Sequence, residues 1–151
     1  MDDHLEDLYQ DIILSHNKRP RNEGELDPHT GKAEGYNPVC GDKVTVFVNE
    51  KDGTIEAVKF VGEGCAISRA SASIMTTVLS GLTLDEAKAR TEGFYRMLTA
   101  AEEPALDFLE DGEVAALVGV RKFPARIKCA TLAWHALEDA LAGTKTGKAE
   151  S

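Results

Sequence analysis

The stretch that decides the fold is KVTVFVNEKDGTIEAVKFVGEGC, residues 43–65. It contains two runs rich in β-branched residues, 43–48 and 54–61, with Lys51-Asp52-Gly53 between them. β-Branched side chains favour strands, and an Asp-Gly pair between two such runs is typical of a tight hairpin turn. The stretch therefore predicts two antiparallel strands, which end where glycines interrupt the pattern just before Cys65.

Apolar residues recur with helical spacing on both sides of this hairpin. The expected helices are an N-terminal one that ends before Arg19, one after Cys65 that ends at Ser80-Gly81, one from a capping box at Thr83 and Glu86 to Leu98, a short piece at 114–117, and a last one from Pro124 to Gly143. The polar residues 20–38, which include several glycines and prolines, are expected to form an extended, mobile connector. This order predicts an α+β fold, with a small antiparallel sheet and helices packed on one face.

The chain of 151 residues is long enough for one domain with its own hydrophobic core. We expect that domain to cover residues 1–143, and the small polar residues 144–151 to form a flexible C-terminal tail. No run approaches the ~20 apolar residues that cross a bilayer. The N-terminus is acidic, where a secretory signal would be basic. The sequence therefore predicts a cytoplasmic protein that does not contact a membrane.

The charge balance and the cysteines narrow the function further. With 26 acidic and 17 basic residues, the formal net charge is -9, which disfavours a surface that neutralises nucleic-acid phosphates. Disulfides are rare in the reducing cytoplasm. The three cysteines are therefore interpreted as free thiols, metal ligands or a nucleophile.

All three cysteines lie where one predicted element gives way to another. Cys40 precedes a strand and has Asp42 two residues later, so both side chains can point the same way. Cys65 is expected at a helix N-terminus, where free backbone N–H groups and the helix dipole favour a thiolate. Cys129 falls in the second turn of the last helix, and Arg126 lies on the same face of that helix.

Thiolates at rigid element ends are typical ligands of zinc and of iron–sulfur clusters. Three thiolates, one carboxylate and Zn²⁺ would carry a net charge of about -2, which calls for a compensating cation. Arg126 is the natural candidate. Taken singly, each cysteine fits a small buried core residue better than a metal ligand, because free cysteine is among the most buried residue types.

Three segments of the chain resemble the SufU branch of the IscU/NifU-type iron–sulfur cluster assembly family. They are NPVCGD at 37–42, GEGCAIS at 62–68 and KFPARIKCATL at 122–132. The resemblance runs from the N-terminal helix to about Gly143, and it implies an IscU/SufU-like fold. It also implies a zinc site made by Cys40, Asp42, Cys65 and Cys129.

The resemblance further implies a zinc-dependent sulfurtransferase. Its sulfur would come from a pyridoxal-phosphate-dependent cysteine desulfurase of the SufS type and would pass to downstream Suf assembly components. In that family the thiol that matches Cys40 accepts the persulfide sulfur, after a histidine of the desulfurase rearranges the zinc ligands. We expect Cys40 to be the catalytic thiol and Arg126 to assist it.

Two alternatives differ in class. One is a non-enzymatic scaffold that holds a [2Fe-2S] cluster on the three cysteines and Asp42. Lys128 stands where IscU proteins have a histidine, and a helical insertion lengthens the interval between Cys65 and Cys129, so the resemblance favours sulfur transfer. The IscU chaperone-docking segment is also replaced here, by FPARIK at 123–128. The other alternative is a purely structural zinc domain, for which three cysteines and one aspartate would be an unusual ligand set.

Overall fold

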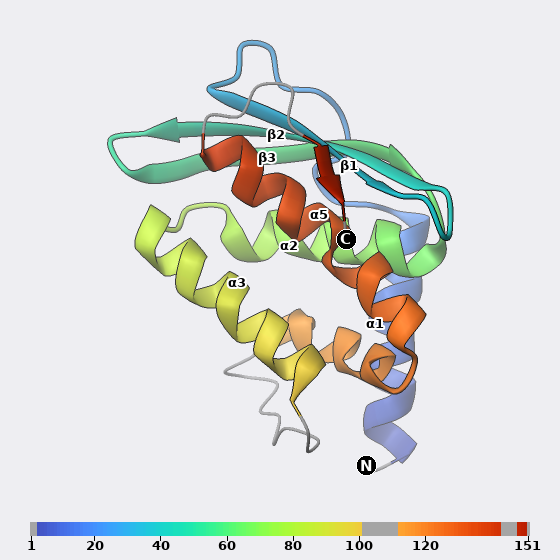
Figure 1. The fold of residues 1–151 in the computed structure, drawn as a ribbon. Helices are drawn as coiled ribbons and strands as arrows, with labels where there is room; N and C mark the ends of the chain where they lie inside the picture. The colour runs from blue at the N-terminus through green and yellow to red at the C-terminus, as the bar shows by residue number, and fades with distance from the viewer. Residues whose placement is uncertain (1–2, 101–111, 143–147, 151) are drawn as a thin grey trace.

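The protein is described from a computed structural model, which covers residues 3–100, 112–142 and 148–150 (Figure 1). Its elements are α1 (Asp3–Lys18), β1 (Gly31–Asn37), β2 (Asp42–Lys51), β3 (Thr54–Glu63), α2 (Ala66–Leu79), α3 (Leu84–Thr99), the 3₁₀ helix η1 (Gly112–Lys122), α5 (Pro124–Leu141) and β4 (Lys148–Glu150). The sheet order is β3-β2-β1-β4, and the helices lie on one face of the sheet. The predicted α+β class is confirmed.

The central hairpin is the one that the sequence predicts. Strands β2 and β3 pair antiparallel, with Val46 opposite Phe60 and a single irregularity at Asn49. Between them Asp52 and Gly53 have φ angles of 53° and 80°, the left-handed conformation that a two-residue hairpin turn requires. Alternating residues of both strands are buried, so the hairpin provides one wall of the core.

Strand β1 lies within the segment that the sequence predicts as a mobile connector, so that prediction is wrong for residues 31–37. β1 pairs antiparallel with β2, and its inward positions are occupied by small residues because α5 crosses close above them. A Cβ on Gly31 would lie 2.2 Å from the carbonyl oxygen of Ala140. One on Gly35 would lie 3.0 Å from the Leu132 side chain. Side chains that normally mark a strand would therefore not fit here.

The C-terminal residues 148–150 form β4, which pairs in parallel with β1. The sequence predicts a flexible tail over 144–151, and the structure differs from it at these three residues. Residues 143–147 and 151 lie outside the described part of the chain, and the single domain over 1–143 stays a prediction.

Helices α2 and α5 pack directly on the sheet, while α1, α3 and η1 form a second layer beneath them (Figure 1). The predicted capping box is confirmed, because Thr83 accepts the backbone N–H of Glu86 and the Glu86 carboxylate accepts that of Thr83. Phe94 of α3 stacks on Trp134 of α5 with ring centroids 4.3 Å apart. The predicted helical piece at 114–117 extends to the whole of η1. No helix in the described residues has the length and apolar character needed to cross a membrane.

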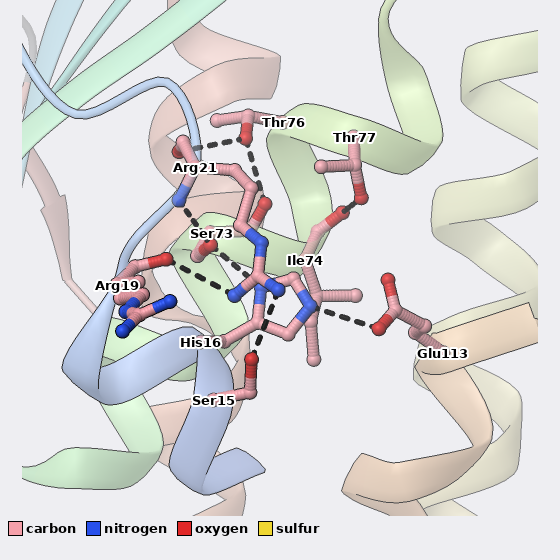
Figure 2. A network of polar contacts seen from close by, with 9 residues as sticks. All are labelled: Ser15, His16, Arg19, Arg21, Ser73, Ile74, Thr76, Thr77 and Glu113. Atoms are coloured by element: carbon pink, nitrogen blue, oxygen red, sulfur yellow. Dashed lines mark hydrogen bonds and ion pairs between the residues drawn. The ribbon is translucent and has the colours of Figure 1, made fainter. Parts of the chain in front are cut away.

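A buried polar network joins α1 to α2 and η1 (Figure 2). His16, near the C-terminal end of α1, is fully buried. Its Nδ1 lies 2.6 Å from Ser73 Oγ and its Nε2 lies 3.0 Å from a Glu113 carboxylate oxygen. Ser73 Oγ also accepts the backbone N–H of Arg21 at 2.8 Å. Both ring nitrogens of His16 and the Ser73 hydroxyl therefore have hydrogen-bond partners inside the protein.

Candidate metal centre

The first part of the site is the turn between β1 and β2. Asn37 and Asp42 are paired residues at the ends of these strands, and residues 38–41 connect them. The Gly41 N–H donates to the Asn37 carbonyl at 2.8 Å, and Gly41 adopts a φ of 73°, which favours glycine. Cys40 lies on this turn and is exposed, whereas Asp42 at the start of β2 is fully buried.

The second part is the N-terminus of α2. Cys65 is the N-cap residue, and its sulfur accepts the Ser68 N–H at 3.4 Å. The Cys65 N–H donates to Asp42 Oδ1 at 2.9 Å, and its thiol lies 3.9 Å from Asp42 Oδ2. Gly64 makes this approach possible, because a Cβ there would lie 2.4 Å from Asp42 Oδ1. The buried carboxylate is thus stabilised by a helix N-terminus.

The third part is Cys129, which α5 buries completely. Its Sγ lies 3.5 Å from Cys40 Sγ. Ligand atoms of Cys40, Asp42 and Cys129 all lie within 4.8 Å of one another. Cys65 falls outside this group, but it contacts Asp42 directly. Residues that are far apart in the sequence therefore meet at one end of the sheet, as the cysteine positions predict.

Without a cation, the surroundings of the cluster disfavour a negative charge on the Cys129 thiol. Burial raises the pKa of the Cys129 thiol above its usual value, and hydrogen bonds with Asp42, Cys40 and Cys65 raise it further. A divalent cation reverses this preference, because a thiol that coordinates a metal is deprotonated. The metal-free cluster therefore favours a protonated Cys129, and a bound cation would favour the thiolate.

The donor set fits zinc. Two thiolates bound tetrahedrally to one zinc at about 2.3 Å lie about 3.8 Å apart, close to the 3.5 Å that separates Cys40 and Cys129. Asp42 adds a hard oxygen ligand, and Cys65 contacts both oxygens of that carboxylate, Oδ1 through its backbone N–H and Oδ2 through its thiol. The residues that would hold the ion are therefore Cys40, Asp42, Cys65 and Cys129. The assignment of these ligands remains a prediction.

Among the ion pairs of the described residues, none links Arg126 to Asp42. Arg126 is exposed and lines a groove of about 570 Å³ between α1, η1 and the start of α2. Ala66 and Ile67, which directly follow Cys65, line the same groove. Arg126 thus shares a groove with the two residues that follow Cys65, and its predicted role in balancing charge stays a prediction.

Asn37 is a site residue to which the sequence assigns no role. It is fully buried, and its Nδ2 points at Cys129 Sγ from 3.8 Å. Its Oδ1 accepts the Val39 N–H at 3.2 Å, which helps to shape the turn that carries Cys40. The only signal in the sequence is an asparagine before Pro38, a pair typical of turns.

Comparisons with known proteins place this site in a family. The family model of the NifU-like N-terminal domain matches residues 8–130, which include all four predicted ligands. The zinc-dependent sulfurtransferase SufU of Bacillus subtilis is 41% identical over 143 residues, which make up 95% of each chain. The iron–sulfur cluster assembly scaffold protein IscU of Streptococcus pyogenes is 42% identical over 137 residues, 91% of this chain and 84% of the other.

Solved structures agree with the fold. The crystal structure of the N-terminal part of a nitrogen-fixing NifU-like protein from Brucella abortus superimposes with a TM-score of 0.79 and 28% identity. The match covers 93% of this chain and 96% of that one. The likeness therefore extends over nearly the whole molecule, and the predicted fold resemblance is confirmed.

Proposed function

Because the chain belongs to the family of NifU-like N-terminal domains, which includes IscU and SufU, we propose that it serves iron–sulfur cluster assembly as a zinc-dependent sulfurtransferase. Its substrate would be the persulfide of a cysteine desulfurase of the SufS type, and its product a persulfide on Cys40. Downstream Suf components would then take the sulfur. We place this activity in the cytoplasm, where free thiols persist.

The observation that carries the proposal is the contrast between the cysteines. Cys40 is exposed on a turn, whereas Cys129 is buried in α5 and Cys65 is held at the N-cap of α2. A sulfur acceptor must reach the sulfur atom of another protein, and only Cys40 presents its thiol on a surface loop. Cys65 and Cys129 are fixed by helices and suit the role of permanent ligands.

The chemical step is a thiol–persulfide exchange. The Cys40 thiolate attacks the outer sulfur of the desulfurase persulfide, so that a new sulfur–sulfur bond forms on Cys40. The old sulfur–sulfur bond breaks, and the desulfurase cysteine leaves as a thiolate. Zinc, when bound, would hold the cysteines as thiolates and shield them from stray oxidation. Asn37 positions the Cys40 turn, and the groove beside Arg126 offers a surface for the desulfurase.

Mass spectrometry tests this proposal. The protein is incubated with a SufS-type desulfurase and cysteine, and the added sulfur is mapped to a peptide. We expect persulfide on Cys40, and we expect Cys40→Ser to abolish both the persulfide and the stimulation of the desulfurase. Persulfide confined to Cys65 or Cys129, or full stimulation by Cys40→Ser, would reject Cys40 as the acceptor.

A second function is favoured by the similarity to the Streptococcus pyogenes scaffold protein IscU. In that case the three cysteines and Asp42 would hold a [2Fe-2S] cluster. Metal analysis of anaerobically purified protein separates the two functions. About one zinc per chain and no visible absorption support the sulfurtransferase, whereas iron, acid-labile sulfide and a coloured protein support the scaffold.

A further inference from the structure

We propose that Cys40 and Cys129 form a reversible disulfide when the protein meets a peroxide, which makes this pair a modification site. The inference concerns the regulation of the same site on which the proposed function rests. It depends on the positions of the thiols and not on sulfur transfer.

The two sulfur atoms are already in van der Waals contact, 3.5 Å apart. A disulfide bond measures about 2.05 Å, so closing it requires a movement of about 1.5 Å. The Cys40 side of the pair can supply this movement. Cys40 lies on a turn with exposed Val39 before it and left-handed Gly41 after it, and a Cβ added to Gly41 would meet no atom within 4 Å. Cys129 is fixed in α5.

Cys65 is a poorer partner for either of these thiols. Its sulfur caps α2 by accepting the Ser68 N–H, and it lies 3.9 Å from the Asp42 carboxylate. A disulfide from Cys65 would remove the cap from the helix. It would also pull the sulfur away from the buried carboxylate. Cys129 also contacts Cys65, but the capping role of Cys65 and the 3.5 Å between the sulfurs of Cys40 and Cys129 favour the Cys40–Cys129 pair.

The reaction proceeds in two steps. The exposed Cys40 sulfur attacks a peroxide oxygen, so that an S–O bond forms, the O–O bond breaks, and water leaves when the oxidant is hydrogen peroxide. Sulfur loses two electrons and the peroxide gains them. Cys129 then attacks the Cys40 sulfur, the S–S bond forms, and the hydroxyl leaves as water with the thiol proton. A strongly reducing dithiol such as dithiothreitol reverses the reaction by thiol–disulfide exchange.

The disulfide would switch off the metal centre. Oxidation consumes two of the four predicted zinc ligands and leaves only Asp42 and Cys65. It also removes the thiol that accepts sulfur. Bound zinc would in turn slow oxidation, because the coordinated sulfurs are not free to react. Oxidation and metal binding are therefore expected to exclude each other at this site.

The sequence allows a clean readout, because trypsin cleavage after lysine and arginine places each cysteine in a separate peptide: residues 33–43, 60–69 and 129–145. The metal-free protein, prepared with a chelator under anaerobic conditions, is treated with hydrogen peroxide, and free thiols are blocked. Non-reduced peptides are then identified by mass. We expect one major species, in which peptides 33–43 and 129–145 are joined with the loss of two hydrogen atoms. Dithiothreitol should restore both.

Two variants provide matched controls. Cys65→Ser should still form the linked peptide, whereas Cys129→Ser should leave Cys40 as a sulfenic acid that dimedone traps. A dominant link to Cys65, a dominant link between two copies of the chain, or irreversible sulfinic acid on Cys40 in the wild type would overturn the proposal.

A zinc-loaded sample separates this inference from the proposed function. We expect zinc to slow the linkage at least tenfold, and each linkage to release one zinc to a colorimetric chelator. Equal rates with and without zinc would overturn the mutual exclusion. If the disulfide forms but Cys40 accepts no persulfide, the proposed function fails and the redox inference stands. If persulfide forms but the disulfide does not, the redox inference fails alone.

Discussion

The substitution Gly64→Ala should damage both the stability and the metal centre. The glycine precedes Cys65, has a φ of 156°, and packs against the buried Asp42 carboxylate. An added Cβ would lie 2.4 Å from Asp42 Oδ1 and 3.0 Å from its Cγ. No methyl group fits at that distance. The carboxylate would have to move, and it would lose the 2.9 Å hydrogen bond from the Cys65 N–H.

Two costs add up in this substitution. Holding alanine in a backbone conformation that belongs almost exclusively to glycine costs about 1 kcal/mol or more. Losing a hydrogen bond to a buried charged group costs about 2 kcal/mol. We therefore expect the free energy of unfolding to fall by about 3 kcal/mol. Zinc affinity should fall as well, because Asp42 is displaced from the other ligands.

Two other glycines serve as controls. Gly24 has a similar φ of 137°, but a Cβ there would meet no atom within 4 Å, so Gly24→Ala carries only the backbone cost of about 1 kcal/mol. Gly93 lies within helix α3, where a Cβ would make only an ordinary 3.9 Å contact with the Arg96 side chain, so Gly93→Ala should stabilise the protein by about 0.5–1 kcal/mol. Urea unfolding of the metal-free proteins measures all three. A loss in Gly64→Ala no larger than in Gly24→Ala would refute the argument that Asp42 is the obstacle.

Three further predictions follow from other parts of the molecule. His16→Ala removes the buried imidazole and should lower the free energy of unfolding in urea by about 2–4 kcal/mol. Glu113→Gln keeps a hydrogen-bond acceptor for His16 and should cost less than about 1 kcal/mol. Equal losses in the two variants would contradict the network. Burial, and then the hydrogen bond to Glu138, raise the pKa of Tyr95, so the folded protein keeps a phenol proton that the unfolded chain releases above about pH 10. Above that pH, the free energy of unfolding should therefore fall faster in the wild type than in Tyr95→Phe, by up to about 1.4 kcal/mol for each pH unit. Parallel plots of unfolding free energy against pH for the two proteins would contradict this prediction. Arg126→Ala should keep its zinc but slow persulfide transfer from the desulfurase, and an unchanged transfer rate across a full titration would remove Arg126 from the mechanism.

The sequence predicts those parts of the fold that depend on local preferences. The hairpin at Asp52-Gly53, the capping box at Thr83 and the proline start of α5 are all confirmed, because each depends on residues close together in the chain. Strand β1 could not be predicted from the sequence, because its inward glycines are required by the close approach of α5, which lies about 100 residues later in the chain. Local propensity contains no information about that neighbour.

The same distinction applies to the site. The thiols could be singled out because cysteine is rare in the chain and each one lies at or soon after a glycine or proline that marks the start of a predicted element. The supporting residues could not be singled out. Asn37 precedes a proline, as asparagine does in many ordinary turns, and its contact with Cys129 depends on how α5 crosses the sheet. His16 looks like the polar end of a helix until α2 and η1 cover it.

The order of the three cysteines along the chain has a consequence for biosynthesis. The ribosome releases Cys40 in the β1–β2 turn, Asp42 at the start of β2 and Cys65 before α2 early in synthesis, whereas Cys129 follows only with α5. A chain interrupted before α5 lacks both the buried thiol and the helix that covers β1. Such a fragment cannot assemble the full ligand set. We therefore expect that only a chain translated through α5 can retain the metal, so that metal binding distinguishes complete chains from interrupted ones.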